Sequence, residues 1–536
     1  MLSEIGFALS VVAVIVIAQT VAARTTLPAP VLLVLVGSGY TVLPLPAMRI
    51  DPTVFFDLLI PPLLYATSIR TSLFGLRRNL GAVLSLSVLL VLVTTFAVAG
   101  ALSMAAAATG VPMGFAAAAA LGAAVAPTDP VAAVAVARRV GMPSWLLTLL
   151  AGEGLLNDAT SLTLFLVATS AVAGNASMLS ATGIFFADVA GGVAFGAVAA
   201  WLVQQVRRVV HDSATHAIVS LATPFLAYLP AEALHTSGVL AVVVCGLLMG
   251  HRSAVVLPGQ SRLELGALWQ VVDELLQGFV FFLIGDQLAT TTRAAATYPS
   301  AAIGLCVGGT VGTVLAARAL WIWAGNQRWV RRVHLGLAEE RRRLERSEMT
   351  VLWWSGSRGV ITLAAAFSIP RVIDGHRFPD RPLLVLCAYL LVLFTLLVQG
   401  TSLSQISRLV RLPANGAERH RRLAEARVAA VDAGLQRLDE LLQDDPQPED
   451  VVAPLRQSAS QRRQRSEDRL AMLGAEQDGQ ANGDRPESRT EIRRRLRMAM
   501  IDAQREELLQ WRDSGRLPDR DLRTLQRELD HEEGLL

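Results

Sequence analysis

Acidic side chains stand inside long apolar stretches of this chain, next to residues that interrupt helices. The stretch 113–137 contains Pro127, Thr128, Asp129 and Pro130. Two prolines in one turn break the backbone hydrogen-bond ladder of a helix and leave carbonyl oxygens without amide partners. A bound cation can satisfy such oxygens, and a bare kink does not need the carboxylate of Asp129. The stretch therefore predicts a cation site, with a simple proline kink as the alternative.

A second polar group lies in the apolar stretch 145–172, which contains Glu153, Asn157 and Asp158. At about 100° per residue, Glu153 and Asn157 share one helix face, and Asp158 lies about a quarter turn away. Carboxylate and carboxamide oxygens are hard ligands that suit an alkali cation. One carboxyl group that holds either a proton or a cation is sufficient for an exchanger. A polar contact between helices is the alternative interpretation.

A buried arginine marks the apolar stretch 349–370, which contains Gly356, Ser357, Arg358 and Gly359. A charge inside a membrane span must be paired, and each such charge is a functional hypothesis. We expect a structural ion pair between Glu153 and Arg358, with Asp129 as the other possible partner of the arginine.

Further polar residues are secondary candidates. Ser357 stands beside Arg358, and Glu232 stands near His235 and Ser237, where a structural hydrogen-bonding role is the leading interpretation of Glu232. Arg318 is expected near a helix end, where an arginine side chain can extend to the membrane interface.

Composition indicates which elements must position these residues. The chain has 536 residues, of which 52% are hydrophobic and 17% charged, and its mean hydropathy is +0.45. An ordinary soluble domain has about a quarter of its residues charged. Half of the 48 basic residues, 24 of them, lie between Arg408 and Arg527. These values exclude a soluble enzyme, a nucleic-acid-binding protein or a disordered chain as a description of the whole, and leave a polytopic membrane protein with a polar tail.

The predicted fold is all-α, with a transmembrane domain over 1–405 and a helical cytoplasmic tail over 406–536. Thirteen apolar stretches are candidate membrane helices by length: 5–22, 28–45, 53–69, 80–102, 113–137, 145–172, 178–206, 215–231, 236–250, 267–289, 299–324, 349–370 and 382–405. The fifth and the twelfth are interrupted and stand seven spans apart, which gives them opposite directions. The layout predicts inverted repeats, spans 1–6 and 8–13, with a broken helix at matching positions.

The arginines predict the orientation. With the N-terminus outside, 17 arginines fall in inner loops and 5 in outer loops. Arginine is enriched in cytoplasmic loops of membrane proteins. We therefore expect an outer N-terminus and a cytoplasmic tail.

Several motifs in order make the chain resemble the sodium/hydrogen exchanger family, the first class of monovalent cation:proton antiporters, in its bacterial form. The resemblance covers most of 1–410. It rests on Pro61-Pro62-Leu63-Leu64-Tyr65, Pro127-Thr128-Asp129-Pro130, Gly152-Glu153-Gly154-Leu155-Leu156-Asn157-Asp158, Glu232 with His235-Thr236-Ser237-Gly238, Phe281-Phe282-Leu283-Ile284-Gly285, Gly356-Ser357-Arg358-Gly359 and Phe394-Thr395-Leu396-Leu397-Val398-Gln399-Gly400.

The resemblance implies a homodimer in which broken helices five and twelve cross and a core domain moves during transport. Carried onto this sequence, Asp158 binds the ion or proton, Asn157 supports the site, Thr128 and Asp129 lie at the adjacent break, and Glu153 pairs with Arg358. Two positions depart from the family pattern: Ala66 and Gly154 stand where members commonly carry an oxygen-bearing side chain.

The expected function is exchange of sodium for protons across the inner membrane, for pH and cation homeostasis, with no cofactor and no nucleic-acid partner. The chain contains no lysine and has Asn157 where the related electrogenic class has a second aspartate, so we expect an electroneutral exchange. A potassium-preferring antiporter of the same fold is the near alternative. A passive cation channel is a remote one. So is an intramembrane enzyme, because the sequence has no His-Glu-x-x-His motif.

Overall fold

The computed structural model describes most of the chain. The described residues are 2–25, 28–40, 55–129, 134, 142, 144–174, 178–210, 212–334, 344–373, 376–410, 416–445, 447–477, 500, 503–504, 506–508, 510 and 525. Pro130 and most of 130–143, and nearly all of the predicted tail segment 488–532, lie outside them.

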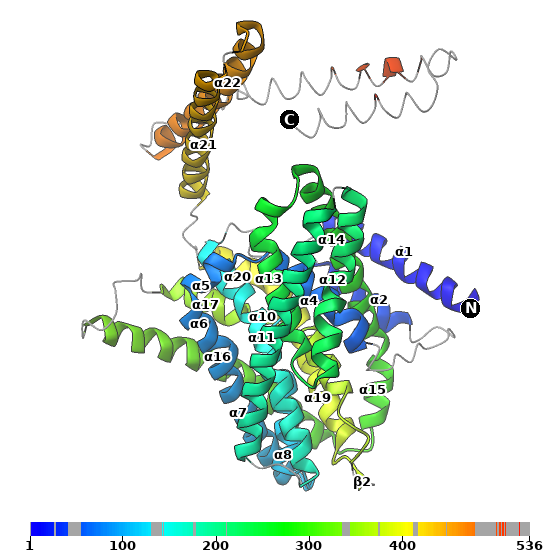
Figure 1. Ribbon diagram of the computed structural model, residues 1–536. Helices are drawn as coiled ribbons and strands as arrows, with labels where there is room; N and C mark the ends of the chain where they lie inside the picture. The colour runs from blue at the N-terminus through cyan, green and yellow to red at the C-terminus, as the bar shows by residue number, and fades with distance from the viewer. Residues whose placement is uncertain are drawn as a thin grey trace. The chain divides into compact units, whose positions relative to one another are not determined.

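The first half of the membrane part consists of helices (Figure 1). They are α1 (Leu2–Arg24), α2 (Ala29–Tyr40), the π-helical turn η1 (Phe55–Leu59) that leads into α4 (Ile60–Ile69), α5 (Leu73–Arg78), α6 (Leu80–Leu84), η2 (Ser85–Leu89), α7 (Leu90–Ala108), α8 (Phe115–Val125) and α10 (Ser144–Val172). Helices are the expected form for these apolar segments, because every backbone amide in a bilayer must be satisfied within the protein.

The second half is helical apart from one short hairpin. Its helices are α11 (Met178–Val209), α12 (Ser213–Ala233), α13 (Gly238–Val256), α14 (Gly259–Asp286), α15 (Leu288–Ala295), α16 (Ser300–His334), α17 (Arg346–Trp354), α18 (Val360–Phe367), α19 (Arg381–Phe394), η3 (Thr395–Gln399) and α20 (Gly400–Leu409). The strands β1 (Val372–Ile373) and β2 (His376–Arg377) pair antiparallel, with Val372 opposite Arg377.

The helices agree with the predicted spans. Among the described residues, seven helices are long and apolar enough to cross a membrane, and five shorter apolar helices accompany them. Each of the thirteen predicted stretches coincides with a helix, with consecutive helices, or, for 113–137, with a helix over its first half. The prediction of a polytopic all-α membrane protein is therefore confirmed. The inverted-repeat relation between the halves stays a prediction.

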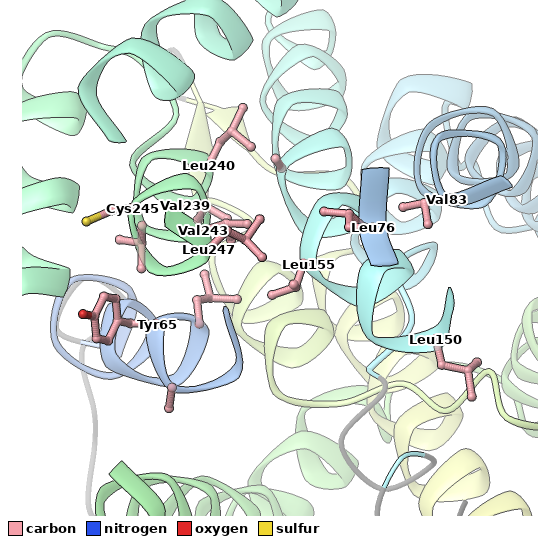
Figure 2. Close-up of a cluster of buried hydrophobic side chains, with 14 of the residues drawn as sticks. Tyr65, Leu76, Val83, Leu150, Leu155, Val239, Leu240, Val243, Cys245 and Leu247 are labelled. Atoms are coloured by element: carbon pink, nitrogen blue, oxygen red, sulfur yellow. The ribbon is translucent and has the colours of Figure 1, made fainter. Parts of the chain in front are cut away.

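Apolar side chains from distant parts of the sequence form the core. One cluster joins α4, α5, α6, α10 and α13, and Figure 2 shows ten of its residues, from Tyr65 to Leu247, labelled among these helices. A second cluster surrounds α8, in which residues 117–125 are all buried. Most of α8 is alanine, so the neighbouring backbones approach closely, and the Gly122 Cα lies against the Thr95 carbonyl of α7. This close packing fixes the end of α8, where the site begins.

The tail is a separate compact unit. The chain divides into Met1–Asn415 and Gly416–Leu536. The predicted boundary after residue 405 falls inside α20, so the division comes ten residues later. In the tail, α21 (Gly416–Asp444) and α22 (Glu449–Gln477) form a helical hairpin with exposed ion pairs Arg456–Asp439 (2.8 Å) and Arg463–Asp432 (3.1 Å).

Candidate functional site

The break at the end of α8 meets the break between α17 and α18. Helix α8 ends at Val125, and residues 126–129 are not helical because Pro127 cannot donate to the ladder. Helix α17 ends at Trp354, and α18 begins at Val360. The Asp129 amide donates to the Ser357 carbonyl (2.7 Å), and the Ser357 hydroxyl donates to the Asp129 carbonyl (2.8 Å). These reciprocal bonds hold the two breaks together and satisfy backbone groups that neither helix can satisfy.

Glycine is required where the two breaks touch. A Cβ atom on Gly359 would collide with the carboxylate of Asp129. The backbone φ of Gly359 is −138°, which any residue can adopt, so the requirement is one of space and not of conformation. Gly359 therefore sets the distance between Asp129 and the start of α18.

Arg358 contacts the end of α8 and the break that follows α17. Its guanidinium donates to the carbonyls of Val125 (3.1 Å), Ala126 (3.3 Å) and Gly356. The last carbonyls of a helix have no partner within it and carry partial negative charge. A fully buried arginine on these carbonyls satisfies both its own donors and the helix end. Arg358 thus acts as a cap on the break.

The expected ion pair between Glu153 and Arg358 is wrong. The partner of Glu153 is Arg318 of α16, which makes a two-point contact: Nη1 donates to Oε1, and Nη2 donates to Oε2 at 3.0 Å. Both side chains are 2% exposed. Arg358 makes no hydrogen bond or ion pair to Glu153 among the described residues, because its donors are taken by carbonyls. The prediction that Arg318 lies near a helix end is also wrong, because α16 continues to His334 and Arg318 lies near the middle of that helix.

Thr128 connects the ion pair to the break. Its hydroxyl donates to Glu153 Oε1 (2.9 Å), while Asn157 Nδ2 donates to the Thr128 carbonyl (3.0 Å) and lies 3.1 Å from the Thr128 hydroxyl oxygen. Asn157 Oδ1 is buried and has no hydrogen-bond partner within the described part of the chain. The amide nitrogen of Asn157 therefore supports the break, and its oxygen is left available as a ligand.

Asp158 faces a cavity beside these breaks. The cavity has a volume of about 70 Å³, enough for a few water molecules. Its polar lining consists of Thr67, Thr128, Asp129, Asp158, Gln277 and Thr362, and its apolar wall comes mainly from α4, α10 and α18. The Asp158 side chain is 5% exposed and makes no hydrogen bond or ion pair with any residue that the structure describes. The structure therefore brings Asp158, Asp129 and Thr128 to one cavity, with Asn157 adjacent.

The remaining candidates lie around this centre. Ser357 is buried and joins the breaks, but it is not part of the cavity wall. Glu232 accepts a hydrogen bond from the Gly238 amide (3.2 Å) and so helps to cap α13, away from the cavity. Of the two departures from the family pattern, Gly154 lines the cavity and Ala66 is fully buried beside Thr67, which does line it.

A polytopic helical protein in which a helix end and a helix break meet beside a buried carboxyl group has features of a membrane ion transporter. The chain belongs to the sodium/hydrogen exchanger family: the family described as "Sodium/hydrogen exchanger, transmembrane" matches residues 10–409. It is a multi-pass membrane protein and a secondary transporter, not an enzyme.

Individual proteins agree with this assignment. An uncharacterized Na(+)/H(+) exchanger of Mycobacterium bovis is 33% identical over 98% of this chain and 94% of its own length. A sodium, potassium, lithium and rubidium/H(+) antiporter of Bacillus pumilus is 30% identical over 75% of this chain and 61% of its own. The structure of the sodium proton antiporter MjNhaP1 from Methanocaldococcus jannaschii has a TM-score of 0.58 at 17% identity, and the match covers 75% of this chain and 97% of that one. This last likeness is one of fold.

Proposed function

We propose that the protein exchanges sodium ions for protons, and that Asp158 holds the one or the other in turn. The observation that carries this proposal is the state of the Asp158 carboxyl group. It is buried at the wall of a small cavity, beside two helix breaks, without an arginine or a hydrogen-bond donor from the described residues. A buried carboxylate needs a compensating charge, and a cation or a proton supplies it.

The proposed cation ligands are oxygens. Asp158 supplies a carboxylate, Asn157 supplies the unpartnered Oδ1, and Thr128 and Asp129 supply oxygens at the break. Such a set suits a hard alkali cation. The charges of Glu153 and Arg318 neutralise each other behind the site. The positive charge of Arg318 therefore does not compensate the negative charge of Asp158. Because Ala66 and Gly154 contribute no side-chain oxygen, we expect fewer ligands and weaker binding than in a typical member.

The proposed stoichiometry assigns the exchanged proton to Asp158 alone, with Asp129 as a cation ligand only. If Asp158 releases one proton for each monovalent cation that it binds, no net charge crosses the membrane in a cycle. Asn157 cannot titrate, and the sequence has no lysine to add a second proton. We therefore propose an electroneutral exchange that serves pH and cation homeostasis.

The setting of the protein is part of the proposal. We place it as a homodimer in the lipid bilayer of the inner membrane, with its N-terminus outside and its tail in the cytoplasm. The bias of 17 inner to 5 outer arginines supports this orientation.

Potassium is the second candidate for the transported ion. The similar protein from Bacillus pumilus is described as an antiporter of sodium, potassium, lithium and rubidium. Oxygen ligands in this small set serve sodium and potassium alike, so the choice between them depends on cavity size and ligand number.

Dequenching of a pH-sensitive dye in everted vesicles from an antiporter-deficient host tests the proposal. Sodium, potassium and lithium are added separately to vesicles with the wild type or with Asp158→Asn. We expect sodium to cause dequenching with the wild type only. Dequenching by potassium alone supports the second candidate. No response to any of the three cations from well-expressed wild type between about pH 6 and 9 contradicts cation:proton exchange.

A further inference from the structure

A second cavity, with none of the lining residues of the first, lies where α11 ends, α12 begins and α13 meets α14. Its volume is about 380 Å³, which is in the range of small-molecule sites. Arg207, Arg208 and His216 line it, together with three valines and Pro258. Three nitrogen-bearing side chains, and no acid among the described residues of the wall, give this cavity a positive character.

Arg207 is buried at this wall without a partner. Arg207 is 5% exposed. Its Nε is buried without a hydrogen-bond partner, and its guanidinium makes no ion pair with any described residue. Tyr65 and Cys245, which interact with Arg207 electrostatically, are neutral at neutral pH (both are labelled in Figure 2). A buried, unpaired guanidinium is costly, so a counter-anion is expected there.

The nearby acids are already engaged elsewhere. Asp212 accepts hydrogen bonds from the amide (2.9 Å) and the hydroxyl (3.0 Å) of Thr215, which caps α12. These bonds hold the pKa of the Asp212 carboxyl below its usual range. Glu264 accepts hydrogen bonds from Gln260 (3.0 Å) and Ser213. Neither carboxylate forms an ion pair with Arg207, so the anion must come from outside the described part of the chain.

We propose that this cavity binds a phosphate group through Arg207 and Arg208. The planar guanidinium offers paired donors that match phosphate oxygens. Exposed valines accompany the cavity: Val255 on its wall is 90% exposed, and Val209, which follows Arg208 in the sequence, is 77% exposed. Arg207 and Arg208 on α11 and Arg252 on α13 lie toward the helix ends that the arginine distribution places at the cytoplasmic side. The phosphate can therefore belong to a phospholipid headgroup of that leaflet or to a free phosphate ion.

Thermal unfolding of the purified full chain tests this proposal without reference to transport. Delipidated protein is titrated with inorganic phosphate, with chloride at equal ionic strength, and with vesicles of phosphatidylglycerol or phosphatidylcholine. We expect the melting temperature of the wild type to rise by a few degrees with phosphate, or with phosphatidylglycerol only. The first result indicates a free ion and the second a headgroup.

Two variants connect the shift to the site. Arg207→Gln should abolish the rise in melting temperature. Arg293→Gln, which removes an exposed arginine on α15, should leave that rise unchanged. Without any phosphate, Arg207→Gln should be at least as stable as the wild type, because an uncompensated buried charge is removed. If Arg207→Gln does not fold, Arg207→Lys, which keeps the charge and loses the paired donors, should show a reduced shift. A shift of equal size with chloride, no shift with any phosphate source, or the same shift in Arg207→Gln overturns the proposal.

Discussion

Glu153 and Arg318 lie 165 positions apart in the sequence, and their buried side chains form a two-point ion pair directly behind the helix break. Thr128 donates to the same carboxylate, so the pair is joined to the backbone at the break. Removal of one member of a buried pair leaves an uncompensated charge and costs about 3–5 kcal/mol. The pair thus holds the site in place.

The first prediction concerns this pair. Glu153→Gln and Arg318→Gln should each lower the free energy of unfolding by about 3–5 kcal/mol. The double variant should lose clearly less than the sum of the two, as measured by a double-mutant cycle on the purified protein. The control cycle combines Glu153→Gln with Arg293→Gln and should be additive. Equal additivity in both cycles would contradict the pairing.

The partner of Glu153 could not be predicted from the sequence, and the reason is geometric. Helical periodicity tells which residues share a face of one helix, but it does not tell which other helix faces them. Arg318 lies six residues before the end of the predicted span 299–324, so an interfacial position was plausible. The helix continues to His334, which places Arg318 near its middle. The rule that a charge inside a membrane span must be paired was the sequence signal that Arg318 has an acidic partner.

Other parts of the structure were readable from residue types. Helices in a membrane need about 20 apolar residues, so hydropathy alone indicated where the apolar helices lie. Pro127 and the glycines around Arg358 indicated the two breaks, because these residues disturb the backbone hydrogen bonds of a helix in any context. The role of Arg358 on three carbonyls was not readable, since unsatisfied carbonyls appear only after the end of α8 is known.

The second prediction uses the contact between Gly359 and Asp129. Gly359→Ala introduces a methyl group where the Asp129 carboxylate lies. Overpacking of this kind destabilises a protein by about 1–3 kcal/mol. If the transport cycle bears this cost, the rate of sodium-driven proton exchange should fall by roughly 5- to 160-fold. Gly309→Ala in α16 meets open space and is the matched control. Wild-type exchange by a well-expressed Gly359→Ala variant would show that the breaks do not need this close approach.

The third prediction concerns Asn157. Asn157→Ala removes the donor to the Thr128 carbonyl and the unpartnered oxygen that we propose as a cation ligand. Loss of each should cost about 1 kcal/mol. The sodium concentration for half-maximal exchange should therefore rise roughly tenfold or more. The measurement is a sodium titration of dye dequenching in everted vesicles. An unchanged half-maximal concentration with a lower maximal rate would argue that Asn157 does not contribute to cation binding.

The fourth prediction concerns the charge moved in each cycle. Because only Asp158 is proposed to exchange its proton, the rate of sodium:proton exchange in proteoliposomes should not depend on an imposed membrane potential. The same vesicles with a known electrogenic transporter serve as the control for the potential. A rate that changes with voltage would require a second transported proton and would rule out the one-for-one cycle.

Competition between a proton and a cation for Asp158 is the central claim, and proton release from the purified protein measures it most directly. Sodium is added to detergent-solubilised protein in weakly buffered solution at a pH where the carboxyl group is still protonated. We expect acidification that saturates with sodium, and none with Asp158→Asn or with a large organic cation. Sodium binding without proton release, or equal release from Asp158→Asn, would contradict it.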